Sequence, residues 1–122
     1  MSDWSSDVCS SIYMLYGPGN DLVSATALTA AGAHMILFST GRGTPFGAPA
    51  PTLKIATNSQ LAAKKSTWID FNAGVVADGE KTLDEAGADL YQLVLDVASG
   101  KQTCAEKKGF REISIFKDGV VL

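Results

Sequence analysis

The continuous apolar run at residues 34–40, which reads HMILFST, limits most strongly how this chain can fold. Such a run is typical of a parallel strand that is buried on both faces. Two helical patterns flank it, at residues 21–31 and at residues 81–99. The first has an N-cap at Asn20 or Asp21 and ends at Gly32. Because parallel strands need crossover connections, the sequence predicts an α/β fold with a layered, mainly parallel sheet and flanking helices.

Shorter elements are expected in the rest of the chain. Strands are predicted at residues 53–57, 68–71 and 111–116, with residues 12–16 as a further candidate, and a short helix at residues 60–65. Residues 44–51 hold three of the four prolines and are predicted to form a loop. The helix at residues 81–99 carries an apolar stripe that we expect to face the core, formed by Leu83, Ala86, Leu90, Val94 and Val97.

The first residues differ in composition from the rest of the chain. Residues 1–11 include five serines, show no helical or strand period, and resemble a translated sequencing adapter. We therefore predict that residues 1–16 are a disordered or foreign N-terminal extension and that residues 17–122 form one domain. An authentic but disordered extension is the alternative, and in either case Trp4 and Cys9 take no part in function.

Composition excludes several classes of protein. Ten Lys and Arg residues against thirteen Asp and Glu leave a net charge of −3, so the basic surface of a dedicated nucleic-acid binder is missing. No apolar run approaches the ~20 residues of a membrane span. Two cysteines 95 positions apart and a single histidine exclude a disulfide scaffold and an all-protein zinc site. We interpret His34 as structural and Cys104 as incidental, and expect a soluble, cytoplasmic domain.

Residues 39–47, which read STGRGTPFG, are the strongest candidate for a binding site. Ligands of parallel sheets bind at the carboxyl ends of the strands, and the glycines beside Arg42 let the backbone approach a ligand closely. The Arg42 guanidinium can bind a carboxylate through two parallel hydrogen bonds, and the hydroxyls of Thr40 and Thr44 add neutral donors. The spacing matches neither a P-loop nor a dinucleotide-binding fingerprint. A glycine-rich turn with a solvated arginine is the alternative.

Two further pairs of polar residues are candidates for a site. Lys54 and Asn58 flank the strand at residues 53–57 and could contact the same anion; for Lys54, an edge-strand lysine in water is the alternative. Asp70 and Asn72 would either contribute to a metal site or form an Asx turn that leads to Gly74.

Five motifs follow one another along the chain: PGND at residues 18–21, AAGA at 30–33, FSTGRGTP at 38–45, PTLKIATN at 51–58 and WIDFNAG at 68–74. In this order they resemble the C-terminal part of the altronate/galactarate dehydratase family of sugar-acid hydro-lyases. The tail at residues 100–122 resembles the galactarate dehydratase ending more than the altronate one. The resemblance spans residues 17–122, and we expect a Rossmann-like C-terminal domain.

The resemblance also implies a function. It implies dehydration of D-galactarate to 5-dehydro-4-deoxy-D-glucarate with a divalent metal ion, iron being favoured, and it makes Thr40, Arg42, Thr44, Lys54 and Asn58 the expected substrate-binding residues. No catalytic base or metal ligand is assigned within this chain, because members of the family are several times longer. The expected partners are a sugar diacid and the remainder of the dehydratase polypeptide, and a homo-oligomer stays open.

Three alternatives follow from these observations. The chain is expected to be a fragment that is inactive alone and that exposes an apolar face once covered by its neighbour, which would promote self-association. It could instead belong to an altronate dehydratase or a related hydroxy-acid dehydratase. The third alternative is a non-catalytic module that binds a small carboxylate through Arg42.

Overall fold

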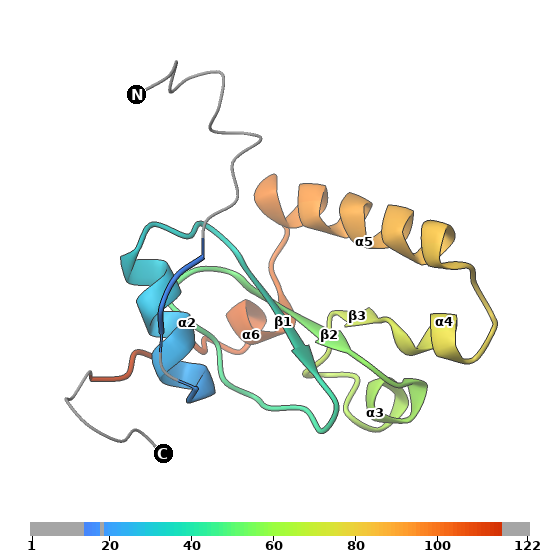
Figure 1. The fold of residues 1–122 in the computed structure, drawn as a ribbon, viewed down its shortest axis with the longest axis horizontal. Helices are drawn as coiled ribbons and strands as arrows, with labels where there is room; N and C mark the ends of the chain where they lie inside the picture. Colours follow the sequence, from blue (N-terminus) through green and yellow to red (C-terminus); the bar gives the residue numbers. More distant parts are fainter. Residues whose placement is uncertain (1–13, 18, 116–122) are drawn as a thin grey trace.

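The computed structural model describes residues 14–17 and 19–115. Three parallel strands lie in the order β1-β2-β3 and are formed by Ile36–Thr40, Thr52–Ala56 and Phe71–Asn72. Within the described residues, five helices flank this sheet (Figure 1): α2 (Asp21–Ala30), α3 (Ser59–Lys64), α4 (Gly74–Ala77), α5 (Leu83–Ala98) and α6 (Cys104–Lys107). The predicted α/β fold with a parallel sheet and flanking helices is confirmed.

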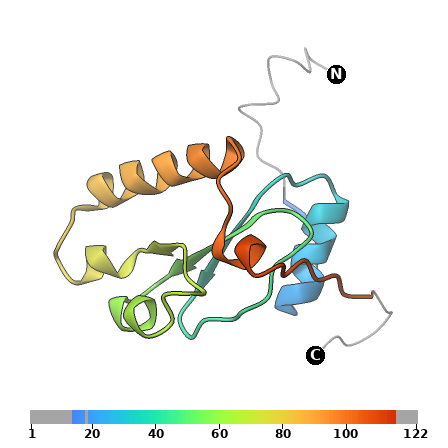
Figure 2. The same ribbon diagram turned by 180° about the vertical axis from the view of Figure 1, so that it is seen from behind.

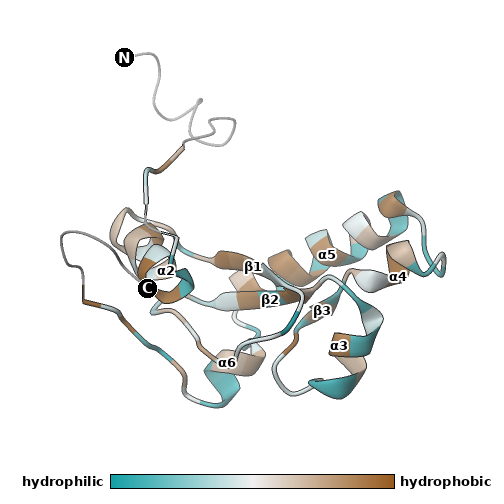
Figure 3. Cartoon of the chain, turned by 60° about the horizontal axis from the view of Figure 1, so that its bottom comes forward, coloured by the Kyte–Doolittle hydropathy of each residue, from teal (hydrophilic) through white to brown (hydrophobic). Residues whose placement is uncertain are grey.

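Helices lie on both sides of the sheet. Helix α6 packs against β2 and is seen clearly from behind (Figure 2), whereas α5 runs along the opposite side of the strands (Figure 3). The register places Phe38 of β1 beside Lys54 of β2, so both side chains belong to the face that α6 covers. The main core cluster lies on this face and joins α2, β1 and the loop that follows it: Ala25, Ile36, Phe46 and Ala48.

The helix ends follow local sequence signals. Asn20 caps α2 through Oδ1, which accepts a hydrogen bond from the Val23 N–H at 3.2 Å. Gly32, with a φ of +110°, follows the end of that helix as predicted. Helix α6 was not predicted, although Thr103 and Glu106 form a capping box at its start. The T-x-x-E spacing of these two residues was the available signal.

Several strand predictions are wrong within the described residues. Strand β1 is not buried on both faces, because it is an edge strand and Leu37 is 52% exposed. Strand β3 has two residues instead of the expected four at residues 68–71. Residues 111–115 form no strand, and residues 116–122 lie outside the described residues. Met14–Tyr16 also form no strand and are exposed, whereas Ile12 and Tyr13 are not described.

Helix α5 buries less of its apolar stripe than expected. Ala86 and Val97 are its buried residues, and Leu83 is 74% exposed. His34, which was interpreted as structural, lies exposed ahead of β1. In the described part of the chain, no helix is long and apolar enough to cross a membrane. Residues 1–13 are not described, so the N-terminal extension and the domain boundary at residue 17 stay predictions.

Candidate functional site: the carboxyl edge of the sheet

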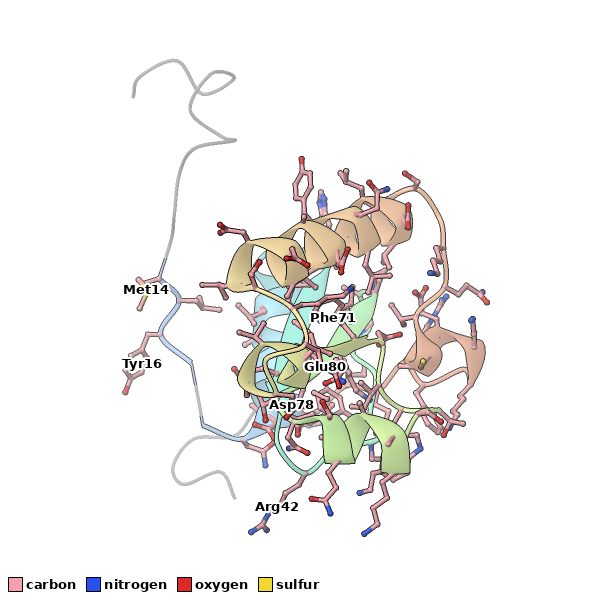
Figure 4. The ribbon with its side chains drawn as sticks, turned by 90° about the vertical axis from the view of Figure 1, so that its right-hand side faces the viewer. Met14, Tyr16, Arg42, Phe71, Asp78 and Glu80 are labelled. Carbon is pink, nitrogen blue, oxygen red and sulfur yellow. The ribbon has the colours of Figure 1, made fainter. Side chains whose placement is uncertain are left out.

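The strands are parallel, so their carboxyl ends meet at one edge of the sheet. The turn after β1 carries Arg42, the turn after β2 carries Asn58 and leads into α3 at Ser59, and the segment after β3 leads to Asp78. The Arg42 side chain is exposed and extends away from the ribbon (Figure 4). This edge therefore gathers polar side chains from segments that are far apart in the sequence.

The turn that carries Arg42 is held by two of the predicted site residues. The Gly43 N–H donates to Thr40 Oγ1 at 2.9 Å, and Asn58 Nδ2 donates to the carbonyl of Gly41 at 3.1 Å. Asn58 also caps α3, since its Oδ1 accepts from the Leu61 N–H at 2.8 Å. Thr40 and Asn58 thus fix the backbone around Arg42.

A pocket of about 270 Å³ lies between this turn and α3. Its lining residues come from the turn, the α3 N-cap and α3 with its C-cap: Gly41, Arg42, Asn58, Gln60, Leu61, Lys64 and Lys65. Three of them are cationic and none is acidic, so the pocket has a positive potential that favours anions. The structure brings Arg42 and Asn58 together here, as the sequence predicts. Lys64 and Lys65 were missed, because a pair of lysines in a short helix has no specific sequence signal.

A second polar group lies beside α3 and α4. Asn72 Nδ2 donates to Ser59 Oγ at 3.1 Å, and the Ser59 hydroxyl donates to Asp78 Oδ2. Asn72 Oδ1 accepts from the Gly74 N–H at 2.9 Å, so the predicted Asx turn is formed by Asn72. Ser59 and Asp78 were not singled out in the sequence, where Asp78 precedes a glycine and is typical of an ordinary turn.

Three of the predicted substrate-binding residues, Thr40, Thr44 and Lys54, are not among the residues that line the pocket. Lys54 lies on the central strand and is 1% exposed, so the alternative of an edge-strand lysine in water is wrong. Its Nζ lies 5.2 Å from the centroid of the Phe46 ring. Burial lowers the pKa of Lys54 to about 8, because the interior disfavours the charged ammonium, and the nearby charge of Asp70 opposes this shift.

Asp70 connects β2 to α6. Its Oδ2 accepts from the Lys54 N–H at 2.9 Å, and its Oδ1 accepts from the Cys104 N–H at 2.8 Å. Both carboxylate oxygens are therefore used by the backbone. Burial raises the pKa of the Cys104 thiol, which makes it a poor nucleophile at neutral pH.

The described residues do not form a metal site by themselves. Residues 14–17 and 19–115 contain no group of three or more His, Cys, Asp or Glu side chains placed to hold a metal ion. The carboxylate of Asp70, considered above as a possible contributor, accepts from two backbone N–H donors.

Comparison with known proteins identifies the family. The model of the C-terminal part of D-galactarate/altronate dehydratases matches residues 6–121. The chain belongs to the D-galactarate/altronate dehydratase family. The residues that line the pocket beside Arg42 lie within the matched range, and the resemblance described above is confirmed at the level of the family.

Alignments with individual members of this dehydratase family show how much of their length the chain spans. The chain is 54% identical over 109 residues to altronate dehydratase from Escherichia coli (strain K12) and 47% identical over 109 residues to altronate dehydratase from Bacillus subtilis (strain 168). It is 40% identical over 107 residues to galactarate dehydratase (L-threo-forming) from Escherichia coli (strain K12). These alignments cover 89%, 89% and 85% of the chain, but 22%, 22% and 20% of the relatives. The chain thus spans about a fifth of the length of the curated relatives it matches.

Proposed function

We propose that this chain serves the dehydration of a sugar acid, D-galactarate or altronate, as the carboxylate-binding C-terminal domain of a hydro-lyase. The observation that carries the proposal is the pocket at the carboxyl edge of the sheet, which holds Arg42 and two lysines and is lined by no acidic residue. The proposed setting is cytoplasmic, with the remainder of the dehydratase polypeptide as partner. A homo-oligomer is compatible with this role.

Both sugar acids have support. The higher identities, 54% and 47%, are to altronate dehydratases, and the galactarate dehydratase is 40% identical. The tail at residues 100–122 resembles the galactarate dehydratase ending more than the altronate one. This resemblance supports D-galactarate as the substrate, with 5-dehydro-4-deoxy-D-glucarate as the product. Both acids present a carboxylate to the pocket, and galactarate carries a second one.

Dehydration removes the proton next to the carboxylate and the hydroxyl on the adjacent carbon, and negative charge builds up on the carboxylate side as the proton leaves. Arg42 can donate two N–H groups to that carboxylate, which stabilises the charge and orients the acid. The Gln60 amide in the same pocket offers neutral hydrogen bonds to substrate hydroxyls. A divalent metal, implied by the family resemblance, would add Lewis-acid stabilisation, and its ligands and the general base are proposed to lie outside the described residues.

The test is turnover by the complete polypeptide that carries this chain, with D-galactarate and altronate assayed in parallel for the keto product. Arg42→Met is expected to lower kcat/KM roughly 100-fold, since two charge-assisted hydrogen bonds are lost. Arg111→Met, which removes an exposed arginine outside the pocket, is the matched control. Turnover of neither acid by the wild type would reject the proposal, and the ratio of the two rates identifies the substrate.

Binding by the 122-residue chain tests the Arg42 pocket, and the source DNA separates a dehydratase domain from a free-standing binding module. Both roles predict saturable binding of galactarate that is lost in Arg42→Met, measured by calorimetry. Only the dehydratase role predicts that the upstream coding sequence in the source DNA encodes the remaining part of a dehydratase. Turnover by the chain alone would contradict its role as an inactive fragment.

A further inference from the structure

The turn that presents Arg42 has a third contact that the sequence does not reveal. Thr40 binds the N–H of Gly43 and Asn58 binds the carbonyl of Gly41. The remaining contact is to the arginine itself, because Lys65 Nζ donates to the carbonyl of Arg42 at 3.1 Å. The peptide that follows Arg42 is therefore tied to the C-terminal end of α3, 23 residues further along the chain.

Lys65 is itself held in place. Its N–H donates to the Leu61 carbonyl at 2.9 Å, and its ammonium lies 4.7 Å from the centroid of the Trp68 ring. A Cβ atom added at Gly43 would lie 3.3 Å from Lys65 Cδ, so the aliphatic stem of the lysine packs directly against the turn. Lys65 is accordingly half-buried, whereas the neighbouring Lys64 is exposed.

The charge of Lys65 is not neutralised within the pocket. No acidic residue lines it, and the contacts of the ammonium described above are a neutral carbonyl and an aromatic ring. An ammonium has three N–H donors, and the bond to the Arg42 carbonyl uses one of them. The same side chain thus fixes the backbone of Arg42 and adds positive potential beside its guanidinium.

We propose that Lys65 is the positioning residue of the Arg42 turn, holding it so that the guanidinium meets the carboxylate of the sugar acid. This inference rests on the proposed function, because it assigns a role within the same pocket. Binding of the acid then depends on the hydrogen bond from Lys65 to the Arg42 carbonyl, and not only on the positive charge that Lys65 adds to the pocket.

The kinetic test compares three variants of the complete polypeptide. Lys65→Met keeps an unbranched apolar side chain but removes the donor, and it is expected to raise KM for the sugar acid roughly tenfold with a much smaller change in kcat. Lys65→Arg restores a donor and is expected to recover most of the loss. Lys64→Met removes an equal charge from the pocket without a contact to the turn, so its smaller effect should disappear at high salt. Equal effects of Lys64→Met and Lys65→Met at every salt concentration would overturn the proposal.

A measurement without substrate keeps this inference separate from the proposed function. In the 122-residue chain, Lys65→Met is expected to accelerate hydrogen exchange of the Gly43 amide severalfold, with Lys101→Met as the control for charge. Faster exchange at Gly43 together with a wild-type polypeptide that turns over neither acid would reject the proposed function and keep the role of Lys65 in holding the turn. Unchanged exchange and unchanged KM would reject the role of Lys65 while the dehydratase assignment stands.

Discussion

Lys54 carries a positive charge in a place where water hardly reaches. It lies in the middle of β2, it is 1% exposed, and Phe46 lies beside its ammonium. Burial lowers its pKa from 10.5 to about 8, because the loss of hydration outweighs the attraction of Asp70. At neutral pH the folded chain therefore holds Lys54 as a cation at a cost in stability.

This cost predicts a pH dependence of stability. Between pH 8 and pH 10.5 the unfolded chain keeps the Lys54 proton and the folded chain loses it, so the contribution of Lys54 to the free energy of unfolding rises with pH. The slope is at most about 1.4 kcal/mol per pH unit for one proton. Lys54→Met is expected to be more stable than the wild type at pH 7, and the difference should shrink as pH approaches 10.5.

Urea unfolding of both proteins at several pH values measures the difference. The comparison with Lys54→Met is necessary because the raised pKa of Cys104 acts in the opposite direction over part of the same range. A difference between the two proteins that does not change with pH would show that Lys54 keeps an ordinary pKa in the fold.

Among the elements, α4 is placed by a very close approach of two backbones. A Cβ atom added at Gly74 would lie 2.3 Å from the Ser59 nitrogen and 2.6 Å from the carbonyl carbon of Asn58. No side chain fits there, so a glycine is needed where α4 meets the N-terminus of α3. Gly87 in α5 is the opposite case, since nothing lies within 4 Å of the corresponding position.

The two glycines give a matched pair of substitutions. Gly74→Ala is expected to lower the free energy of unfolding by about 3 kcal/mol or more, because backbone atoms must move. Gly87→Ala is expected to raise it by about 1 kcal/mol, because alanine has the higher helix propensity at an exposed helical position. Thermal or urea unfolding measures both changes. Equal effects of the two substitutions would contradict the close packing of α4 on α3.

The positions of α2, β1 and β2 could be predicted from the sequence because their signals are local. Caps, a helix-ending glycine and an apolar run act within a few residues of one another. Strand β3 has only two residues, and its place depends on pairing with β2. The strand predicted at residues 111–116 is wrong over its described part, residues 111–115, because alternation of polar and apolar residues does not supply a pairing partner.

At the largest scale, residues 14–17 and 19–115 place no strand beside the outer edge of β1. Ile36 and Thr40 take part in backbone hydrogen bonds toward β2 and the residues that flank it, so the intervening Leu37 and Ser39 direct their backbone groups to the free edge. A groove of about 260 Å³ lies along β1 and α2, with Leu28 and Leu37 among its lining residues. Neither charge nor proline protects this edge, which favours pairing with another strand.

The open edge predicts concentration-dependent self-association of the 122-residue chain. Leu37→Lys is expected to weaken association roughly tenfold or more, because it places a charge where an apolar side chain would be buried. Leu83→Lys alters an exposed leucine on α5, away from this edge, and serves as the matched control. Sedimentation velocity over a range of concentrations measures the effect. A wild-type chain that stays monomeric throughout would contradict the prediction.

The parallel α/β architecture, the turn that carries Arg42 and an N-cap at Asn20 or Asp21 follow from local sequence signals, because these depend on residues close together in the chain. Only the tertiary structure decided that Lys54 is buried, since the order of the strands makes β2 central. It also decided that Asp70 binds the N–H of Cys104 and that Lys65 holds the Arg42 turn, across 34 and 23 residues. Contacts over such distances form only when the strands and helices assemble, so no local pattern contains them.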